Sequence, residues 1–187
     1  FVDKELAPYV QQRTAYRSMR QQNQLDPSSY NNPGNLEDRK WAGGVGLYAM
    51  KRDGQTLTDK DGKKFKTKPF TIFDSPEMGY RALARVLING YIGKTFEEAV
   101  KKFAPSVENK TEPYMNTLVQ QVGVKDKNEK ITQNNVKQVM KAITKHENEE
   151  NLRSYYTDKH VEDGYNLAIK FPDVPENTSF QDLKNNL

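Results

Sequence analysis

Asn31-Asn32-Pro33-Gly34-Asn35-Leu36 is the stretch around which the fold and the candidate site are organised. The proline fixes its own φ and keeps Asn32 out of the helical region, while Gly34 can take a positive φ. The pair therefore predicts a tight turn that holds the flanking amides in fixed directions. The amides of Asn31, Asn32 and Asn35 can each donate and accept, which suits a polar, uncharged ligand such as a sugar. A buried connecting turn is the alternative interpretation.

Trp41, the only tryptophan, follows this turn within the stretch Trp41-Ala42-Gly43-Gly44. Its flat apolar ring is the kind of surface on which sugar rings stack. A tryptophan that simply belongs to the core is the other interpretation.

The composition favours a polar folded protein of one domain, with or without tails. The chain has 187 residues, of which 29% are charged and 35% hydrophobic, and this length can bury a sizeable core. No apolar run approaches the roughly 18 residues that a transmembrane helix needs. The net charge of +4 is mild; it favours encounters with an anionic cell wall or nucleic acid, although solubility alone also explains it.

Metal and cofactor chemistry finds no support in the sequence. There is no cysteine, and the two histidines, His146 and His160, are isolated from each other. We therefore expect no metal, no cofactor and no thiol nucleophile.

Three segments follow from the chain pattern. Residues 1–25 predict a polar helix that docks on a partner, residues 26–170 a folded domain, and residues 171–187 an extended tail. Because the chain begins at Phe1 rather than Met, we also expect a processed protein or a piece of a longer one.

Residues 45–73 alternate turn signals with β-prone residues and predict a small antiparallel β-hairpin ribbon anchored by Phe65, Phe70 and Ile72. Asp53-Gly54 and Asp61-Gly62 are both hairpin-type dipeptides. The tip is basic, with Lys60, Lys63, Lys64, Lys66 and Lys68. Nucleic-acid binding by this tip is only weakly indicated, because the lysines have few aromatic neighbours and no recognition-helix pattern is present.

The remaining sequence predicts five amphipathic helices. The first is capped by Ser75, with Pro76 at its first position, and ends near Gly90. The second begins with a Thr95–Glu98 capping box and ends before Ala104-Pro105. The third covers 111–123, the fourth carries apolar residues over 136–143 and continues into His146-Glu147-Asn148, and a weaker fifth spans about 157–170. Their apolar stripes share one spacing, so the helices can share one core. The fold class is mainly α, of the α+β type.

Five blocks occur in one order over roughly residues 30–170. They are the turn at 31–36, Trp41-Ala42-Gly43, Phe73-Asp74-Ser75-Pro76-Glu77-Met78-Gly79-Tyr80-Arg81-Ala82, Phe103-Ala104-Pro105 with Glu108-Asn109-Lys110-Thr111 and Tyr114, and Ala142-Ile143-Thr144-Lys145-His146-Glu147-Asn148. Tyr156-Thr157-Asp158 then precedes a helix that contains Gly164. This order resembles a family of tailed-phage virion proteins regarded as lysozyme-like or cell-wall-degrading. The chain departs from that family at Glu149, where the usual form has glycine, and in its longer, more basic hairpin.

The resemblance implies a lysozyme-like helical domain that cleaves peptidoglycan glycan strands, as a lysozyme or a lytic transglycosylase does. It implies location in a bacteriophage virion and release into the host envelope or periplasm, where the wall is degraded locally during genome ejection. Its partners would be peptidoglycan and other virion proteins of the tail or internal core. A noncatalytic structural or ejection protein with the same fold is the alternative.

Glu147 is the candidate catalytic acid. Glycosidic cleavage needs a carboxylic acid that keeps its proton near neutral pH. Glu147 is expected at the C-terminal end of a helix, where the negative end of the helix dipole disfavours ionisation. The neighbouring carboxylates of Glu149 and Glu150 also disfavour ionisation of Glu147, because like charges repel. A solvated, frayed helix end in a charge-rich stretch is the alternative.

The other candidate residues of the substrate site each have an alternative interpretation. His146 either hydrogen-bonds the site or faces solvent, and we favour solvent. Glu77 is a possible second carboxylate, but its position in a first helical turn is better explained by the dipole. Glu108 either orients the next helix or lines the groove, and Tyr48 could stack on a sugar ring in place of Trp41.

Overall fold

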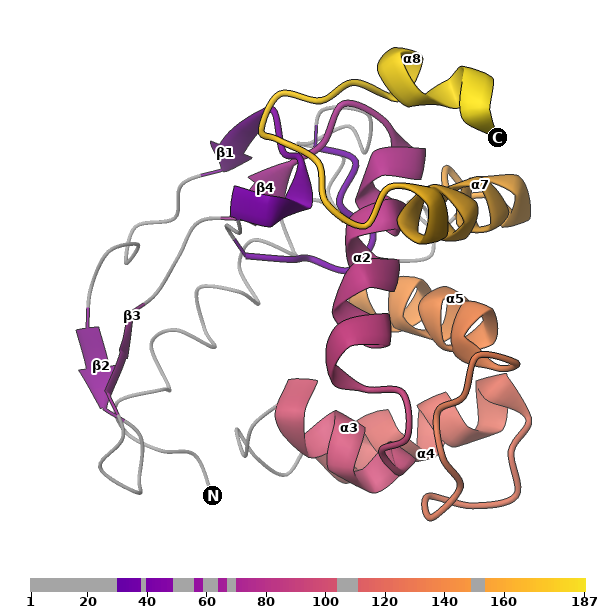
Figure 1. Ribbon diagram of the computed structural model, residues 1–187. Helices are drawn as coiled ribbons and strands as arrows, with labels where there is room; N and C mark the ends of the chain where they lie inside the picture. The colour runs from indigo at the N-terminus through magenta and orange to yellow at the C-terminus, as the bar shows by residue number, and fades with distance from the viewer. Residues whose placement is uncertain are drawn as a thin grey trace.

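The computed structural model describes residues 30–37, 40–48, 56–58, 64–66, 70–103, 111–148 and 154–187. The predicted docking segment 1–25 lies outside these residues, as does Glu108. Figure 1 shows the arrangement of the elements.

The described part of the chain is mainly helical, as the sequence predicts. Its α-helices are α2 (Pro76–Gly90), α3 (Phe96–Phe103), α4 (Thr111–Val122), α5 (Val136–Glu147), α7 (Asp158–Lys170) and α8 (Phe180–Leu183), with 3₁₀ turns η2 (Lys40–Ala42) and η3 (Lys184–Asn186). The strands are β1 (Gly46–Tyr48), β2 (Thr56–Thr58), β3 (Lys64–Lys66) and β4 (Phe70–Ile72).

The helix starts that the sequence predicts are confirmed. Ser75 Oγ accepts a hydrogen bond from the backbone N–H of Met78 at 3.2 Å, with Pro76 at the first helical position of α2. At α3, the Thr95 backbone N–H donates to Glu98 Oε2 at 2.8 Å, and the Glu98 N–H donates to Thr95 Oγ1 at 3.2 Å. Both motifs satisfy N–H groups that a helix start leaves without partners.

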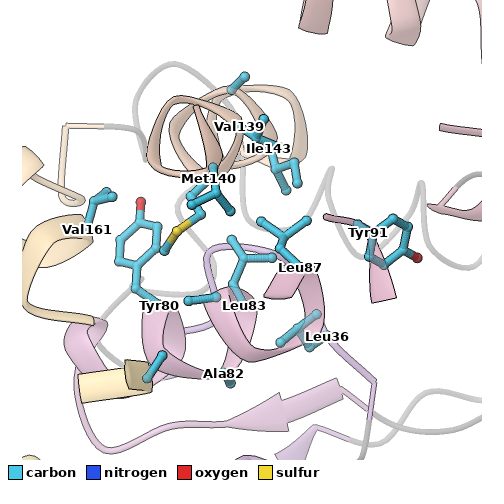
Figure 2. Packing of buried hydrophobic residues seen from close by; sticks show 14 of the residues in the cluster. Leu36, Tyr80, Ala82, Leu83, Leu87, Tyr91, Val139, Met140, Ile143 and Val161 are labelled. Carbon is cyan, nitrogen blue, oxygen red and sulfur yellow. The ribbon is translucent and has the colours of Figure 1, made fainter. Parts of the chain in front are cut away.

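Helix α2 is the centre of the core, where it packs against α7 and α5. Figure 2 shows Tyr80, Leu83 and Leu87 of α2 directed towards Met140 and Ile143 of α5. All five side chains are buried. The predicted apolar stripes of these helices therefore do share one core.

Two glycines allow α2 to be enclosed this closely. A Cβ atom on Gly79 would lie 2.0 Å from the main-chain oxygen of Asn31, and one on Gly164 of α7 would lie 2.4 Å from Tyr80 Cβ. Because neither neighbour can move without shifting main chain or core, both positions require the absence of a side chain. The turn at 31–36 is thus pressed onto one side of α2 and α7 onto another.

The strands form two antiparallel ladders. β1 pairs with β4, with Leu47 opposite Thr71, and β2 pairs with β3, with Leu57 opposite Phe65. Of the predicted anchors, Phe70 is buried and Ile72 is half-buried, whereas the side chain of Phe65 lies outside the described part.

The segment after α7 differs from the extended tail that the sequence predicts. A turn at Glu176 and Asn177 interrupts it, Ser179 caps the short helix α8, and η3 follows. The segment also packs on the domain, since Val174 and Leu183 are each 8% exposed. Arg81, which is fully buried in α2, donates to the main-chain oxygens of Phe171 and Pro172 at 2.9 and 3.0 Å.

Candidate functional site

The Asn-rich turn has its left-handed residues where the sequence did not indicate them. Asn31 and Asn35 have φ values of 49° and 50°, whereas Gly34 is not in the positive-φ region. Asparagine tolerates this conformation better than most residues. The freedom of Gly34 to take a positive φ is therefore not used; the position is crowded instead, because a Cβ there would lie 3.0 Å from Leu83 Cδ1.

The side chain of Asn32 forms hydrogen bonds within the turn and to β4. Its Nδ2 donates to the main-chain oxygens of Leu36 and Thr71, both at 2.9 Å, and its Oδ1 accepts from the Leu36 N–H at 2.9 Å. The residue is 1% exposed. An amide carries two N–H donors, so both are used inside the protein and none is left for a sugar. Asn32 fastens the turn to β4 in place of the predicted ligand contact.

Asn31 is likewise directed inward. Its Nδ2 donates to the Phe73 main-chain oxygen at 3.2 Å, and its Oδ1 accepts from the Tyr155 hydroxyl at 2.7 Å. The residue is buried. These contacts tie the start of the turn to the chain between β4 and α2 and to the segment before α7.

Glu147 and the Asn-rich turn meet directly, although they are far apart in the chain. Asn35 Nδ2 donates to Glu147 Oε2 at 2.9 Å and to the Glu147 main-chain oxygen at 3.2 Å, across 112 sequence positions. Glu147 is the last residue of α5 and is 9% exposed. Its predicted place at a helix C-terminus is confirmed, and the alternative of a solvated, frayed helix end is wrong.

Asn148 makes a second connection between the same two segments. Its Nδ2 donates to the main-chain oxygen of Pro33 at 2.9 Å and to that of Thr144 at 2.8 Å. Thr144 is held in turn, because its hydroxyl lies 2.7 Å from the Tyr80 hydroxyl in α2. Burial raises the pKa of Tyr80 well above its usual range, so this phenol stays neutral.

The hydrogen bond from Asn35 orients the Glu147 carboxyl without supplying a charge. An amide is a neutral donor, and it reaches one carboxyl oxygen and the main-chain oxygen of the same residue. The last turn of α5 also contains Lys145 and His146, cations or potential cations that suit the negative end of a helix dipole.

His146 is not directed simply to solvent, which corrects our preferred interpretation. Its imidazole stacks on the ring of Tyr114 in α4, with centroids 3.6 Å apart and an angle of 35° between the planes. Tyr114 is buried and His146 half-buried. The imidazole thereby joins α5 to α4 beside Glu147, a contact that no local sequence pattern indicates.

The other predicted site residues lie as follows. Glu77 is in the first turn of α2, as the dipole explanation requires, and its Oε1 lies 3.8 Å from His160 Nε2 of α7. Trp41 lies in η2, half-buried against the core. Tyr48 lies in β1 with its backbone opposite Phe70, and its side chain is outside the described part.

A resident metal finds no support among the described residues, which contain no group of three or more His, Cys, Asp or Glu side chains able to hold one. None of the described helices is long and apolar enough to cross a membrane.

Comparison with known proteins identifies no family for this chain. The chain matches no protein-family model, and no curated protein matches it.

Proposed function

We propose that this chain is the glycan-strand-cleaving module of a phage virion protein, with Glu147 as its general acid. The observation that carries the proposal is the hydrogen bond from Asn35 Nδ2 to Glu147 Oε2 at 2.9 Å. It joins the candidate acid to the Asn-rich turn, the two segments that the resemblance pairs although they are 112 positions apart in the chain. A lysozyme-like arrangement of the domain, with the β ribbon beside the acid-bearing helix, is part of the same proposal.

In the proposed reaction, the protonated carboxyl of Glu147 gives its proton to the glycosidic oxygen that leaves. The acetamido oxygen of the substrate attacks the anomeric carbon as that bond breaks, as in substrate-assisted glycosidases. Water, or a hydroxyl of the same sugar, then opens the intermediate and returns a proton to Glu147. Water yields a hydrolysed end and the hydroxyl an anhydro end, and both routes need the same acid.

Asn35 has the central role in orienting this acid. Its amide holds Oε2 and the main-chain oxygen of Glu147 at once, which restricts the rotation of the carboxyl about its own side chain. Trp41 and Tyr48 remain the proposed stacking residues. Asn31 and Asn32 act as supports of the turn, because their amides are engaged within the protein.

The decisive experiment compares the wild-type chain with Glu147→Gln on purified peptidoglycan and measures soluble fragments by mass spectrometry. The glutamine oxygen can still accept the hydrogen bond from Asn35, so the turn and α5 stay connected. We expect product release to fall by roughly 100-fold or more, the usual contribution of a general acid. Glu176→Gln, at an exposed glutamate, is the matched control and should act like wild type. Unchanged release by Glu147→Gln would refute the assignment.

A noncatalytic virion structural protein is the second candidate, and a specific observation favours it. Glu147 is 9% exposed and bonded to Asn35, so the pair also serves as a fastener between the turn and α5. This candidate predicts no fragments from wild-type protein and a lowered Tm for Glu147→Ala. Deleting residues 1–25 should then block incorporation into particles; deleting 171–187 is a poorer test, since Val174 and Leu183 pack on the domain.

A further inference from the structure

Asn148 is the most deeply buried polar residue at the end of α5 that the proposed mechanism does not use. It is 1% exposed, and its backbone N–H donates to the Thr144 main-chain oxygen at 3.0 Å. Its side-chain Nδ2 donates to Pro33 and Thr144 main-chain oxygens at 2.9 and 2.8 Å. Both amide hydrogens therefore have acceptors, one in the last turn of its own helix and one in the Asn-rich turn.

Asn35 and Asn148 connect the same two segments in opposite directions. Asn35 donates from the turn to Glu147, and Asn148 donates from the helix end back to the main chain of Pro33. We call these two amides and their acceptors the reciprocal amide clamp. The last carbonyl groups of a helix have no hydrogen-bond partners within the helix. The clamp supplies hydrogen bonds at this end of α5, so the final residue is held more firmly than the helix alone would hold it.

We propose that Asn148 is a positioning residue for the Glu147 acid. It does not touch the substrate; it holds the main chain of Glu147 so that the carboxyl meets Asn35 and the glycosidic oxygen in one geometry. Misplacement of a catalytic group by about 1 Å can cost on the order of 100-fold in rate. Asn35 and Asn148 thus both fix the position of Glu147, Asn35 from the turn and Asn148 from the end of the helix. The inference rests on the proposed function of Glu147.

The test measures kcat and KM of Asn148→Ala on soluble glycan-strand oligomers, well below the Tm of the variant. Asn135→Ala is the matched control, because Asn135 lies at the other end of α5 and also donates its amide to a main-chain oxygen, that of Lys130 at 3.0 Å. We expect Asn148→Ala to lower kcat roughly 10- to 100-fold and to change KM less than about twofold. Asn135→Ala should lower Tm and leave kcat within about twofold.

Asn148→Ser is the second variant, and it keeps the test valid if the alanine variant does not fold. Its hydroxyl has one hydrogen to donate and lies closer to its own main chain than Nδ2 of Asn148 does, so it suits the Thr144 oxygen four residues earlier and does not reach that of Pro33. The loss of packing is smaller than with alanine. We expect the same fall in kcat. A kcat within twofold of wild type for either folded variant overturns the inference, as does an equal fall in kcat for Asn135→Ala.

The two proposals fail in distinguishable ways. A wild-type chain without activity, or full activity in Glu147→Gln, overturns the function and the positioning role together. An inactive Glu147→Gln combined with a normal Asn148→Ala overturns the positioning role alone.

Discussion

Replacing Arg81 with methionine should detach the C-terminal segment and destabilise the whole domain. The guanidinium is fully buried in α2, and it donates to the main-chain oxygens of Phe171, Pro172 and Ala42 at 2.9, 3.0 and 3.2 Å. Burial lowers its pKa to about 10, which still leaves it charged at neutral pH. All three hydrogen-bond acceptors are neutral carbonyl groups, and the nearby Asp173 carboxylate opposes the lowering of the pKa.

The size of the effect follows from these contacts. A hydrogen bond to a charged group contributes about 1.5–3 kcal/mol, so three lost bonds cost roughly 5–9 kcal/mol. Part of this loss is offset, because burial disfavours the guanidinium cation, as its lowered pKa indicates, and methionine carries no charge. The net loss expected for Arg81→Met is therefore on the order of 4 kcal/mol, a large share of the roughly 5–15 kcal/mol typical of a domain.

Urea unfolding followed by Trp41 fluorescence measures this loss, since Trp41 is the only tryptophan and precedes Ala42. Trypsin cleavage after Lys170 gives a local measurement, because the next residue, Phe171, is one that Arg81 holds. We expect faster cleavage in Arg81→Met. The control is Arg85→Met on the same helix, where an exposed bond to Asn89 is lost and less than about 1 kcal/mol is expected. A loss below 1 kcal/mol with unchanged cleavage in Arg81→Met would refute the reasoning.

Two further predictions test the helix packing and the surface charges. Gly164→Ala should cost about 3 kcal/mol of unfolding free energy, since its Cβ would lie 2.4 Å from Tyr80 Cβ; Gly90→Ala, which would meet only the flexible Lys102 ammonium, should cost nothing. Lys127 and Lys101 lower the pKa of Glu97 below its usual 4.5, so its contribution to stability is present above about pH 4.5 and is lost as the pH falls through the lowered pKa. The Tm difference between wild type and Glu97→Gln should accordingly shrink between pH 7 and pH 3; a constant difference would contradict this.

The helices could be predicted because their signals are local. The cap of α2 and the capping box of α3 each act within three residues, and the apolar stripes repeat within single helices. The C-terminal segment could not be predicted in this way. Its place depends on Arg81, which lies 90 positions before its partner Phe171, and on two buried apolar side chains whose partners are distant in the chain.

The candidate site was predicted in part, and the errors have one physical origin. Resemblance, not periodicity, paired Glu147 with the Asn-rich turn. The sequence shows that asparagine can donate, but only the fold shows where the donors go: the amides of Asn31 and Asn32 are used inside the protein. The stacking of His146 on Tyr114 is equally a product of how α5 meets α4.

Asn32 and Asn35 of the turn therefore differ in the groups to which their amides donate. Asn32 binds the turn to itself and to β4, and its two donors have main-chain acceptors, so its loss acts on folding before it acts on any ligand. Asn35 donates to the carboxyl of Glu147, so its loss acts first on the acid. A fall in activity at position 32 consequently reports a damaged turn, whereas a fall at position 35 without a change in Tm reports the chemistry. Both amides donate to two acceptors within the protein, but only Asn35 has the carboxyl of Glu147 among them, and this makes position 35 the informative one.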